Sequence, residues 1–347
     1  MQSIKFNFFP IETYVGVLIR ILTAYFILKS IGVTFIDKFV KVMYNIAIIS
    51  LFFYFFIFLF PNLEQILINN FTTFAIIGPD VSSRYSIFGL YTIVPDTNAL
   101  ILLNSGPFWE KGAFGGYLVI ALLFNLLKDD NLKNKINLIL IITIITTQST
   151  TAYLALFVLL FFIYYKRFKN IIFKIIITFL ILISSYYAYT TFDFLGKKID
   201  QQLKMAKVVN THDLRNADSQ RFINILKDWN DFQGHEFIGR GPNPKTRYSG
   251  KSYTHEIRTV GITDLVVRYG LPFFLLVIYL LYLSIKRYEK YVHNYNKFQT
   301  IGIVFVILII LMSEVYFNYP FFWSLVFLFV IFKDQGLNYL DKCNINK

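Results

Sequence analysis

Long apolar runs, separated by short polar or basic connections, make up most of the chain. An α-helix needs roughly 20 mostly apolar residues to cross a bilayer, and runs near that length recur along the sequence. The strongest run covers residues 39–60 and stops at Pro61-Asn62. The pattern predicts an all-α, polytopic integral membrane helical bundle of about nine spans. The predicted spans are residues 14–35, 39–60, 113–127, 136–145, 151–165, 171–189, 265–285, 301–315 and 321–332.

Three polar stretches interrupt the apolar pattern. Residues 63–112 read as a re-entrant segment, and residues 146–151 form the small polar turn Thr-Thr-Gln-Ser-Thr-Thr. Residues 191–260 form one long loop. No internal repeat and no low-complexity linker divides the chain. We therefore predict a single membrane domain, residues 1–347, with the long loop, residues 191–260, inside it.

Composition supports a membrane protein. The chain is 56% hydrophobic and 19% aromatic, and its mean hydropathy is +0.53, which is too apolar for a soluble globular domain. The net charge of +13 is better explained by basic connections that fix orientation than by nucleic-acid binding. The single cysteine, Cys343, excludes an internal disulfide.

The basic residues of the short connections indicate the orientation of the chain. They fall on alternate connections, and cytoplasmic connections carry the excess of Lys and Arg, so all of them should lie on the cytoplasmic side of the inner membrane. The N-terminus, residues 63–112 and the long loop then lie outside. The long loop is itself basic, but long loops cross membranes largely regardless of charge. The basic connections contain Lys29, Lys38 and Lys41; Lys128, Lys133 and Lys135; Lys166, Arg167, Lys169 and Lys174; Lys286, Arg287, Lys290 and Lys297; and Lys333, Lys342 and Lys347.

The long loop contains an amphipathic pattern that begins at Arg221. Residues 221–229 have helical period, and Asp218 or Ser219 is a suitable N-cap. The apolar face of this helix, made of Phe222, Ile225, Leu226 and Trp229, is expected to lie on the membrane surface or against the spans. Arg221 would project from the polar side, as a substrate contact or as an ordinary solvated arginine.

Two further features of the loop could carry chemistry. Arg240 lies between Gly239 and Gly241, and such glycines let backbone amides approach a ligand closely, although an ordinary turn fits equally well. His255 and Glu256 precede the next span. A histidine beside a carboxylate can act as a general base on a sugar hydroxyl, and the alternative is an interfacial histidine with a purely local role.

The earlier outer segment contributes Arg84 and Glu110, the latter at the start of a predicted span. A carboxylate there is costly unless it is paired or faces water, so Glu110 is either functional or bound to a loop arginine. The sequence lacks a His/Cys/Glu cluster at metal-ligand spacing and a Gly-x-Ser-x-Gly motif. Gly250-Lys251-Ser252 is present, but residue 245 is lysine instead of the glycine that the phosphate-binding motif Gly-x-x-x-x-Gly-Lys-Ser/Thr requires. We therefore expect no metal and no cofactor, and neither ATP hydrolysis nor serine hydrolysis.

Four motifs, taken in order, resemble those of a known family: the Wzy-type O-antigen and capsular polysaccharide polymerases, whose fold is shared with O-antigen ligases. The resemblance covers residues 71–323, and the order and spacing of the motifs are its specific part. The closing residues Ser313-Glu-Val and Phe321-Phe-Trp323 are also similar. The motifs are Phe108-Trp-Glu-Lys-Gly-Ala-Phe114, Thr147-Gln-Ser-Thr-Thr-Ala-Tyr153, the arginine-led helix with Ile238-Gly-Arg-Gly241, and Gly261-Ile-Thr-Asp-Leu-x-x-x-Tyr-Gly270.

The resemblance implies a metal-independent membrane glycosyltransferase that uses undecaprenyl-diphosphate-linked oligosaccharides on the outer leaflet. Arginines of the outer loops would hold the diphosphate and sugars, and we predict Arg84, Arg221, Arg240 and Arg258 for this role. The predicted catalytic residues are His255, Glu256 and Glu110, although many family members have His-Asn where this chain has His255-Glu256. A flippase and a chain-length regulator are candidate protein partners, besides the lipid bilayer itself.

Two alternatives stay open at this point. A ligase of the same class would move finished glycan to another acceptor. A transporter or flippase of lipid-linked oligosaccharide belongs to a different class and would line its spans with charges. Here the charged residues gather in one outer loop instead, which favours an enzyme that works at the outer face.

Overall fold

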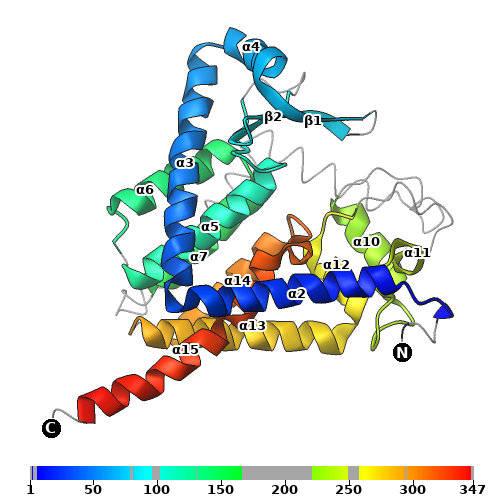
Figure 1. Cartoon of the computed structure of the whole chain (residues 1–347), viewed down its shortest axis with the longest axis vertical. Helices are drawn as coiled ribbons and strands as arrows, with labels where there is room; N and C mark the ends of the chain where they lie inside the picture. Colours follow the sequence, from blue (N-terminus) through cyan, green and yellow to red (C-terminus); the bar gives the residue numbers. More distant parts are fainter. Residues whose placement is uncertain are drawn as a thin grey trace. The chain divides into compact units, whose positions relative to one another are not determined.

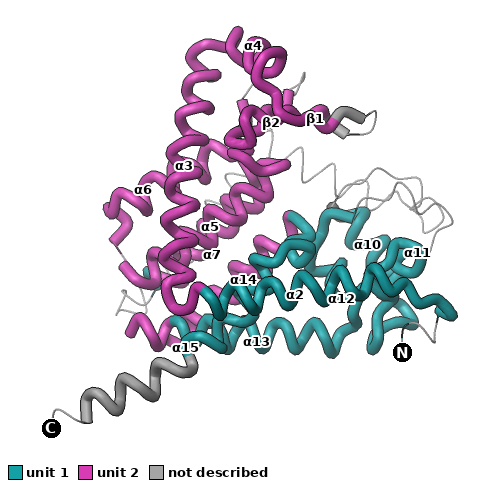
Figure 2. The backbone as a smooth tube through the Cα atoms, in the orientation of Figure 1, with its two compact units in different colours: residues 1–30, 164–288, 314–347 teal, residues 31–163, 289–313 magenta. Residues whose placement is uncertain are grey.

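The computed structural model of the protein (Figure 1) describes residues 2, 6–78, 81–95, 102–129, 131–165, 221–248, 258–293 and 295–344. The chain divides into two compact units (Figure 2). Unit 1 is Met1–Ser30, Tyr164–Tyr288 and Glu314–Lys347, and unit 2 is Ile31–Ile163 and Glu289–Ser313. Within the described residues, most of both units is helical.

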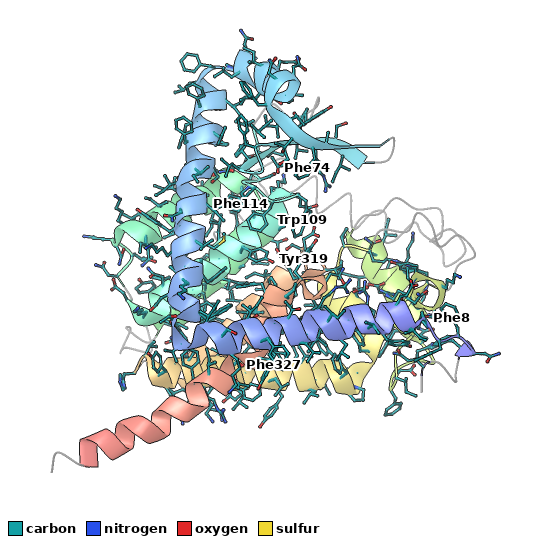
Figure 3. The ribbon with its side chains drawn as sticks, viewed as in Figure 1. Phe8, Phe74, Trp109, Phe114, Tyr319 and Phe327 are labelled. Carbon is teal, nitrogen blue, oxygen red and sulfur yellow. The ribbon has the colours of Figure 1, made fainter. Side chains whose placement is uncertain are left out.

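Unit 1 is built around two long helices, α2 (Ile11–Ile31) and α13 (Leu271–Tyr291). The last residues of both helices are assigned to unit 2. A third helix, α15 (Pro320–Asn344), contacts both α2 and α13. The Ser284 hydroxyl of α13 donates to the Val326 carbonyl at 2.8 Å, and Tyr25 of α2 meets Phe327 edge-on (Figure 3). The smaller elements are α10 (Arg221–Phe232), α11 (Pro244–Arg247), α12 (Gly261–Tyr269) and the short helix η3 (Tyr316–Asn318).

Unit 2 has a helical core. Helix α5 (Lys111–Lys128) is buried along most of its length and packs against α3 (Phe35–Leu59) and α6 (Lys135–Thr147). Small residues allow close approach: a Cβ at Gly115 would lie 2.6 Å from the Ala152 Cβ. The remaining helices are η1 (Gly32–Thr34), α4 (Asn62–Phe71), α7 (Thr150–Tyr165, which ends in unit 1) and α14 (Lys297–Leu311).

Unit 2 also contains a small sheet, which the sequence did not predict, within a described chain that is mainly helical, as the all-α prediction expects. The stretch predicted as re-entrant, residues 63–112, forms α4 and three antiparallel strands, β1 (Thr72–Gly78), β2 (Val81–Ile87) and β3 (Tyr91–Ile93). β-branched and aromatic residues favour strands, and the buried Ile87, Tyr91 and Ile93 pack on Ile57 of α3. The sheet is therefore held by the end of a long apolar helix.

Among the described residues, three helical segments are long and apolar enough to cross a membrane: the run Ile11–Leu59, which joins α2 and α3, then α5 and α13. Shorter apolar helices are Lys135–Thr147, Thr150–Tyr165, Lys297–Leu311 and Pro320–Phe332. These helices confirm the positions of seven predicted apolar segments to within a few residues. The segment 265–285 covers parts of two helices, and the predicted span 171–189 lies outside the described residues. Nine membrane spans stay a prediction.

The predicted span 265–285 is wrong in one respect, because it is divided between α12 and α13. Gly270 separates them with φ +83°, a conformation that glycine adopts without a steric penalty. The Gly270 amide still bonds back to Val266, whereas the Leu271 amide donates to Glu236 of the loop at 2.7 Å. Pro272 then lies in the first turn of α13, where a missing N–H costs nothing.

Candidate functional site

The centre of the folded loop is a buried network of charges between α10 and α12. Arg247 is 1% exposed and contacts three carboxylates: Asp228 at 2.6 Å, Asp231 at 3.4 Å and Asp264 at 3.1 Å. A buried charge is tolerated only when it is paired and hydrogen-bonded. The carboxylates come from both helices, so Arg247 joins α10, α11 and α12 into one body.

Two further arginines extend this network. Arg258 contacts Asp231 at 3.3 Å and Asp228 at 3.9 Å, and Arg268 contacts Asp264 at 2.7 Å. The Tyr248 ring lies beside both Arg247 and Arg258, with guanidinium carbons 5.3 and 5.4 Å from its centre. We call these residues the arginine–aspartate network: Arg247, Arg258, Arg268, Asp228, Asp231 and Asp264.

The buried face of α10 carries polar and acidic residues, Asn224, Asp228 and Asp231. Trp229, on the predicted apolar face, is 60% exposed. An exposed indole is compatible with the predicted position of this face on the membrane surface, which stays a prediction. The arginines from α11 and from residues 258–268 require the buried carboxylates of α10 as partners.

The environment of Asp228 shifts its titration. Burial raises the pKa of the Asp228 carboxyl, and the charge of Arg247 and the Thr263 hydroxyl offset only part of this effect. Thr263, in the first turn of α12, donates to the second carboxylate oxygen of Asp228. The network thus contains one carboxylate that takes a proton more readily in the folded protein than in the unfolded chain.

The network also accounts for the position of Arg258, one of the predicted substrate-binding residues. Its side chain is 5% exposed and contacts Asp228 and Asp231. Loss of either carboxylate would leave a buried charge without its partner, so these contacts hold Arg258 in place. Direct contact of Arg258 with substrate stays a prediction, while its structural role follows from these contacts.

The Gly-Arg-Gly turn caps a helix. The amides of Arg240 and Gly241 donate to Val267 and Arg268 at 2.7 and 3.0 Å, and the Gly239 amide donates to His235 at 2.8 Å. The last carbonyls of a helix lack partners inside the helix, and these amides satisfy them at the end of α12. Of the two interpretations of this turn, the bonds of the Arg240 and Gly241 amides therefore favour the ordinary turn over the ligand-facing one.

Close packing explains why Gly239 in that turn and Gly270 on the facing segment must both be glycine. Gly239 has φ +69°, and a Cβ there would lie 2.6 Å from the Arg268 backbone. Gly270 on the facing segment would place a Cβ 2.3 Å from the Phe237 carbonyl. The two glycines let the turn and the α12–α13 junction approach each other, which fixes the backbone that carries Arg240.

The side chain of Arg240 belongs to a second group of residues, which includes the N-terminal segment. Its Nε donates to the Thr246 carbonyl at 2.8 Å, and its guanidinium lies over the Phe6 ring, 5.6 Å from the centre. Phe6 also stacks on His235 at 5.4 Å, and Lys245 lies over Phe8 at 5.4 Å (Figure 3 labels Phe8). We call residues 235–248 the basic turn.

The basic turn is fixed to the first turns of two long helices. The Asn243 amide donates to the Thr13 hydroxyl of α2 at 2.8 Å, and the Glu236 carbonyl accepts from Leu271 of α13. Figure 1 shows α2 and α13 running in the same direction, each with its first turn near α10 and α11. Sequence reasoning missed Phe6, Phe8 and His235, because no local pattern links the N-terminus to residues 235–248.

Two further predicted site residues, Arg84 and Glu110, lie in unit 2. Glu110 lies at the N-terminal end of α5 and Arg84 on β2, with Arg84 Nη2 4.0 Å from the Glu110 carboxylate. Both side chains are partly exposed, at 22% and 28%. The expectation that Glu110 binds a loop arginine is confirmed, and a catalytic role for it stays a prediction. An exposed pair of this length adds little stability.

Three predicted site residues have no described side chain. His255 and Glu256 lie outside the described residues, and Arg221 is described only as the first residue of α10. Their predicted roles stay predictions. Of the predicted substrate arginines, the described side chains are thus those of Arg84, Arg240 and Arg258, of which Arg240 and Arg258 belong to unit 1.

Comparison with known proteins returned no matching family model and no matching curated sequence. What the fold and the site define is a class: a mainly helical protein with apolar helices of membrane-spanning length and a folded loop rich in arginine. The loop combines a buried charge network with a basic turn fixed to two of those helices.

Proposed function

We propose that the protein is a membrane glycosyltransferase that polymerises undecaprenyl-diphosphate-linked oligosaccharide repeat units into a surface polysaccharide, O-antigen or capsule. The observation that supports this most is the basic turn, where Arg240 and Lys245 are fixed next to the first turns of α2 and α13. If these helices span the inner membrane, the two cations lie at the depth where a lipid-borne diphosphate would lie.

The chemistry of the transfer matches these groups. The acceptor hydroxyl oxygen bonds to the anomeric carbon, the bond from that carbon to the diphosphate breaks, and the diphosphate leaves with the electron pair. Cationic donors stabilise that developing charge, and a guanidinium can do so with two hydrogen bonds. Arg240 and Arg221 are the arginines we assign to this task, with Lys245 as a further positive charge.

The acceptor hydroxyl must also lose a proton, which requires a base. We assign this role to His255, which lies beside Glu256. In sequence it is only a few residues before α12, the helix that carries Asp264 of the charge network. Glu110 is the proposed alternative, since a carboxylate can accept a proton and Glu110 lies next to Arg84 at the start of α5. The arginine–aspartate network has a supporting role, because it holds the basic turn and the residues before α12 in one body.

A deletion strain tests the proposal. A polymerase extends glycan on its lipid carrier, so loss of the gene should leave single repeat units exposed on the outer leaflet. Loss of a ligase would instead leave long carrier-linked polymer. Loss of a flippase would leave single units on the cytoplasmic leaflet, protected from an enzyme added outside. Either of these two results would contradict the proposed polymerase.

A further inference from the structure

Phe237 is the most exposed large apolar residue of the described chain, at 79%. It is part of the basic turn, directly after Glu236, whose carbonyl binds Leu271 at the start of α13. The exposed apolar surface of α13 begins at that residue and continues along the helix through Leu271, Leu275, Leu276 and Tyr279, which are 43–60% exposed. Phe237 thus lies at the end of an apolar stripe on a helix long enough to cross a membrane.

Helix α2 repeats this arrangement on the other side of the basic turn. Its exposed apolar residues include Ile11, Val15 and Leu18, and Phe9 just before it is 63% exposed. Thr13 of the same first turn binds Asn243 of the basic turn at 2.8 Å. Two helices therefore begin their exposed apolar stripes where they are hydrogen-bonded to residues 235–248, and both stripes start with an exposed phenylalanine.

We infer that Phe237 and Phe9 insert into the outer boundary of the lipid bilayer and hold the basic turn at the depth of the lipid headgroups. Aromatic residues are enriched at membrane interfaces, where the ring enters the acyl boundary. Lys245, which is exposed, and the neighbouring Arg240 match the negative phosphates of that layer in charge. The partner of this surface is phospholipid, and the inference rests on the proposed membrane location but not on the transferase activity.

A depth measurement tests this inference. Cys343→Ser removes the natural cysteine, and Phe237→Cys introduces a single site for an environment-sensitive fluorophore. The labelled protein would be reconstituted in phospholipid vesicles that contain quenchers at defined depths. The exposure of Phe237 makes the substitution compatible with folding. Tyr279→Cys provides a reference roughly 12 Å further along α13, from 1.5 Å per residue. Lys133→Cys, in an exposed connection of unit 2, provides a solvent reference.

We expect the label at residue 237 to be quenched most by quenchers just below the headgroups, and the label at residue 279 most by quenchers deeper in the acyl chains. The label at residue 133 should be quenched by aqueous iodide alone. Quenching of residue 237 by iodide alone would overturn the inference. The inference would also be overturned if neither lipid quenchers nor iodide reached residue 237 and the labelled chains cross-linked to each other. In that case a second copy of the protein would cover Phe237.

The measurement separates this inference from the proposed function. A protein with residue 237 in the lipid boundary but without polymerase activity would contradict only the transferase. An active polymerase whose residue 237 is exposed to water would contradict only the anchor.

Discussion

Arg247 is the largest fully buried side chain among the described residues, and three aspartates explain how a guanidinium can be there. Removing one partner of a buried ion pair leaves a charge without compensation and costs about 3–5 kcal/mol. Asp264 binds both Arg247 and Arg268, so its loss affects two guanidinium groups. Loss of Asp264 should therefore destabilise the described part of the loop strongly.

We predict that Asp264→Ala lowers the free energy of unfolding by about 3–5 kcal/mol, because Arg247 and Arg268 each lose a buried partner. Thermal unfolding of the purified protein in detergent measures this effect. Asp37→Ala is the matched control, since Asp37 binds Lys128 at 2.8 Å with both side chains more than half exposed, and it should change stability by less than about 1 kcal/mol. Equal losses of unfolding free energy in the two variants would contradict the structural role proposed for the arginine–aspartate network.

The raised pKa of Asp228 predicts a pH dependence of stability. Because burial makes the folded state bind this proton more readily, the contribution of Asp228 to stability is largest at low pH. It declines as pH rises from the unfolded value near about 3.9 through the folded pKa. Asp228→Asn cannot titrate, so wild type should lose stability relative to this variant as pH rises through that window. The unfolding midpoints of both proteins, measured across the acidic pH range, would test this prediction. A difference between the two midpoints that stays constant or changes in the opposite direction would contradict the raised pKa of Asp228.

At the scale of the elements, the junction between α12 and α13 depends on one glycine. Gly270 combines φ +83° with a Cβ position 2.3 Å from the Phe237 carbonyl. We predict that Gly270→Ala destabilises the protein by more than about 1 kcal/mol, because its backbone, with φ +83° and ψ 166°, is nearly confined to glycine and because the turn must also move. The measurement is again thermal unfolding, combined with polymer synthesis in cells.

Gly89→Ala is the matched control for that prediction. Gly89 has a similar φ of +69°, but no atom lies within 4 Å of its Cβ position. It should therefore show the backbone penalty alone. If Gly89→Ala and Gly270→Ala destabilise equally, the close approach of the turn to the junction contributes nothing to stability.

Local pattern predicted the long elements well and their interruptions poorly. The bounds of α3, α5 and α7 were predicted to within a few residues, because each helix is one continuous apolar run that ends at polar or basic residues. The break at Gly270 was missed, because its conformation depends on Phe237, far away in sequence. The strands were missed because a half-exposed sheet gives only a weak alternating pattern.

The site was predicted less completely than the fold, for the same reason. Arg240 was identified from its glycines, yet the amides of Arg240 and Gly241 bond to the end of α12. Arg247 has no local signal in the sequence, although Asp228 and Asp231, three residues apart on one helix face, could have pointed to a cation opposite them. Pairing between distant segments cannot be derived from the period of one helix.

For the whole molecule, the basic turn links the ends of α2 and α13, so both helices should enter the membrane from the same side. This agrees with the proposed nine spans and with an outside N-terminus. We predict that a topology reporter fused after Asn210 is extracytoplasmic and one fused after Lys347 is cytoplasmic. Reporters that both read the same side would contradict the nine-span arrangement.

The central claim is that this protein joins lipid-linked repeat units at its basic turn, and the most direct measurement is the reaction of purified protein. It would be incubated in vesicles with an undecaprenyl-diphosphate-linked repeat unit, without ATP and with EDTA, and the products separated on a gel. We predict a ladder of polymer for the wild type and for the control Lys128→Ala. Arg240→Ala should give none, and Arg240→Lys little, because an ammonium cannot form the paired hydrogen bonds of a guanidinium. A wild-type protein that gives no ladder, or an Arg240→Ala variant that gives a normal one, would contradict the account.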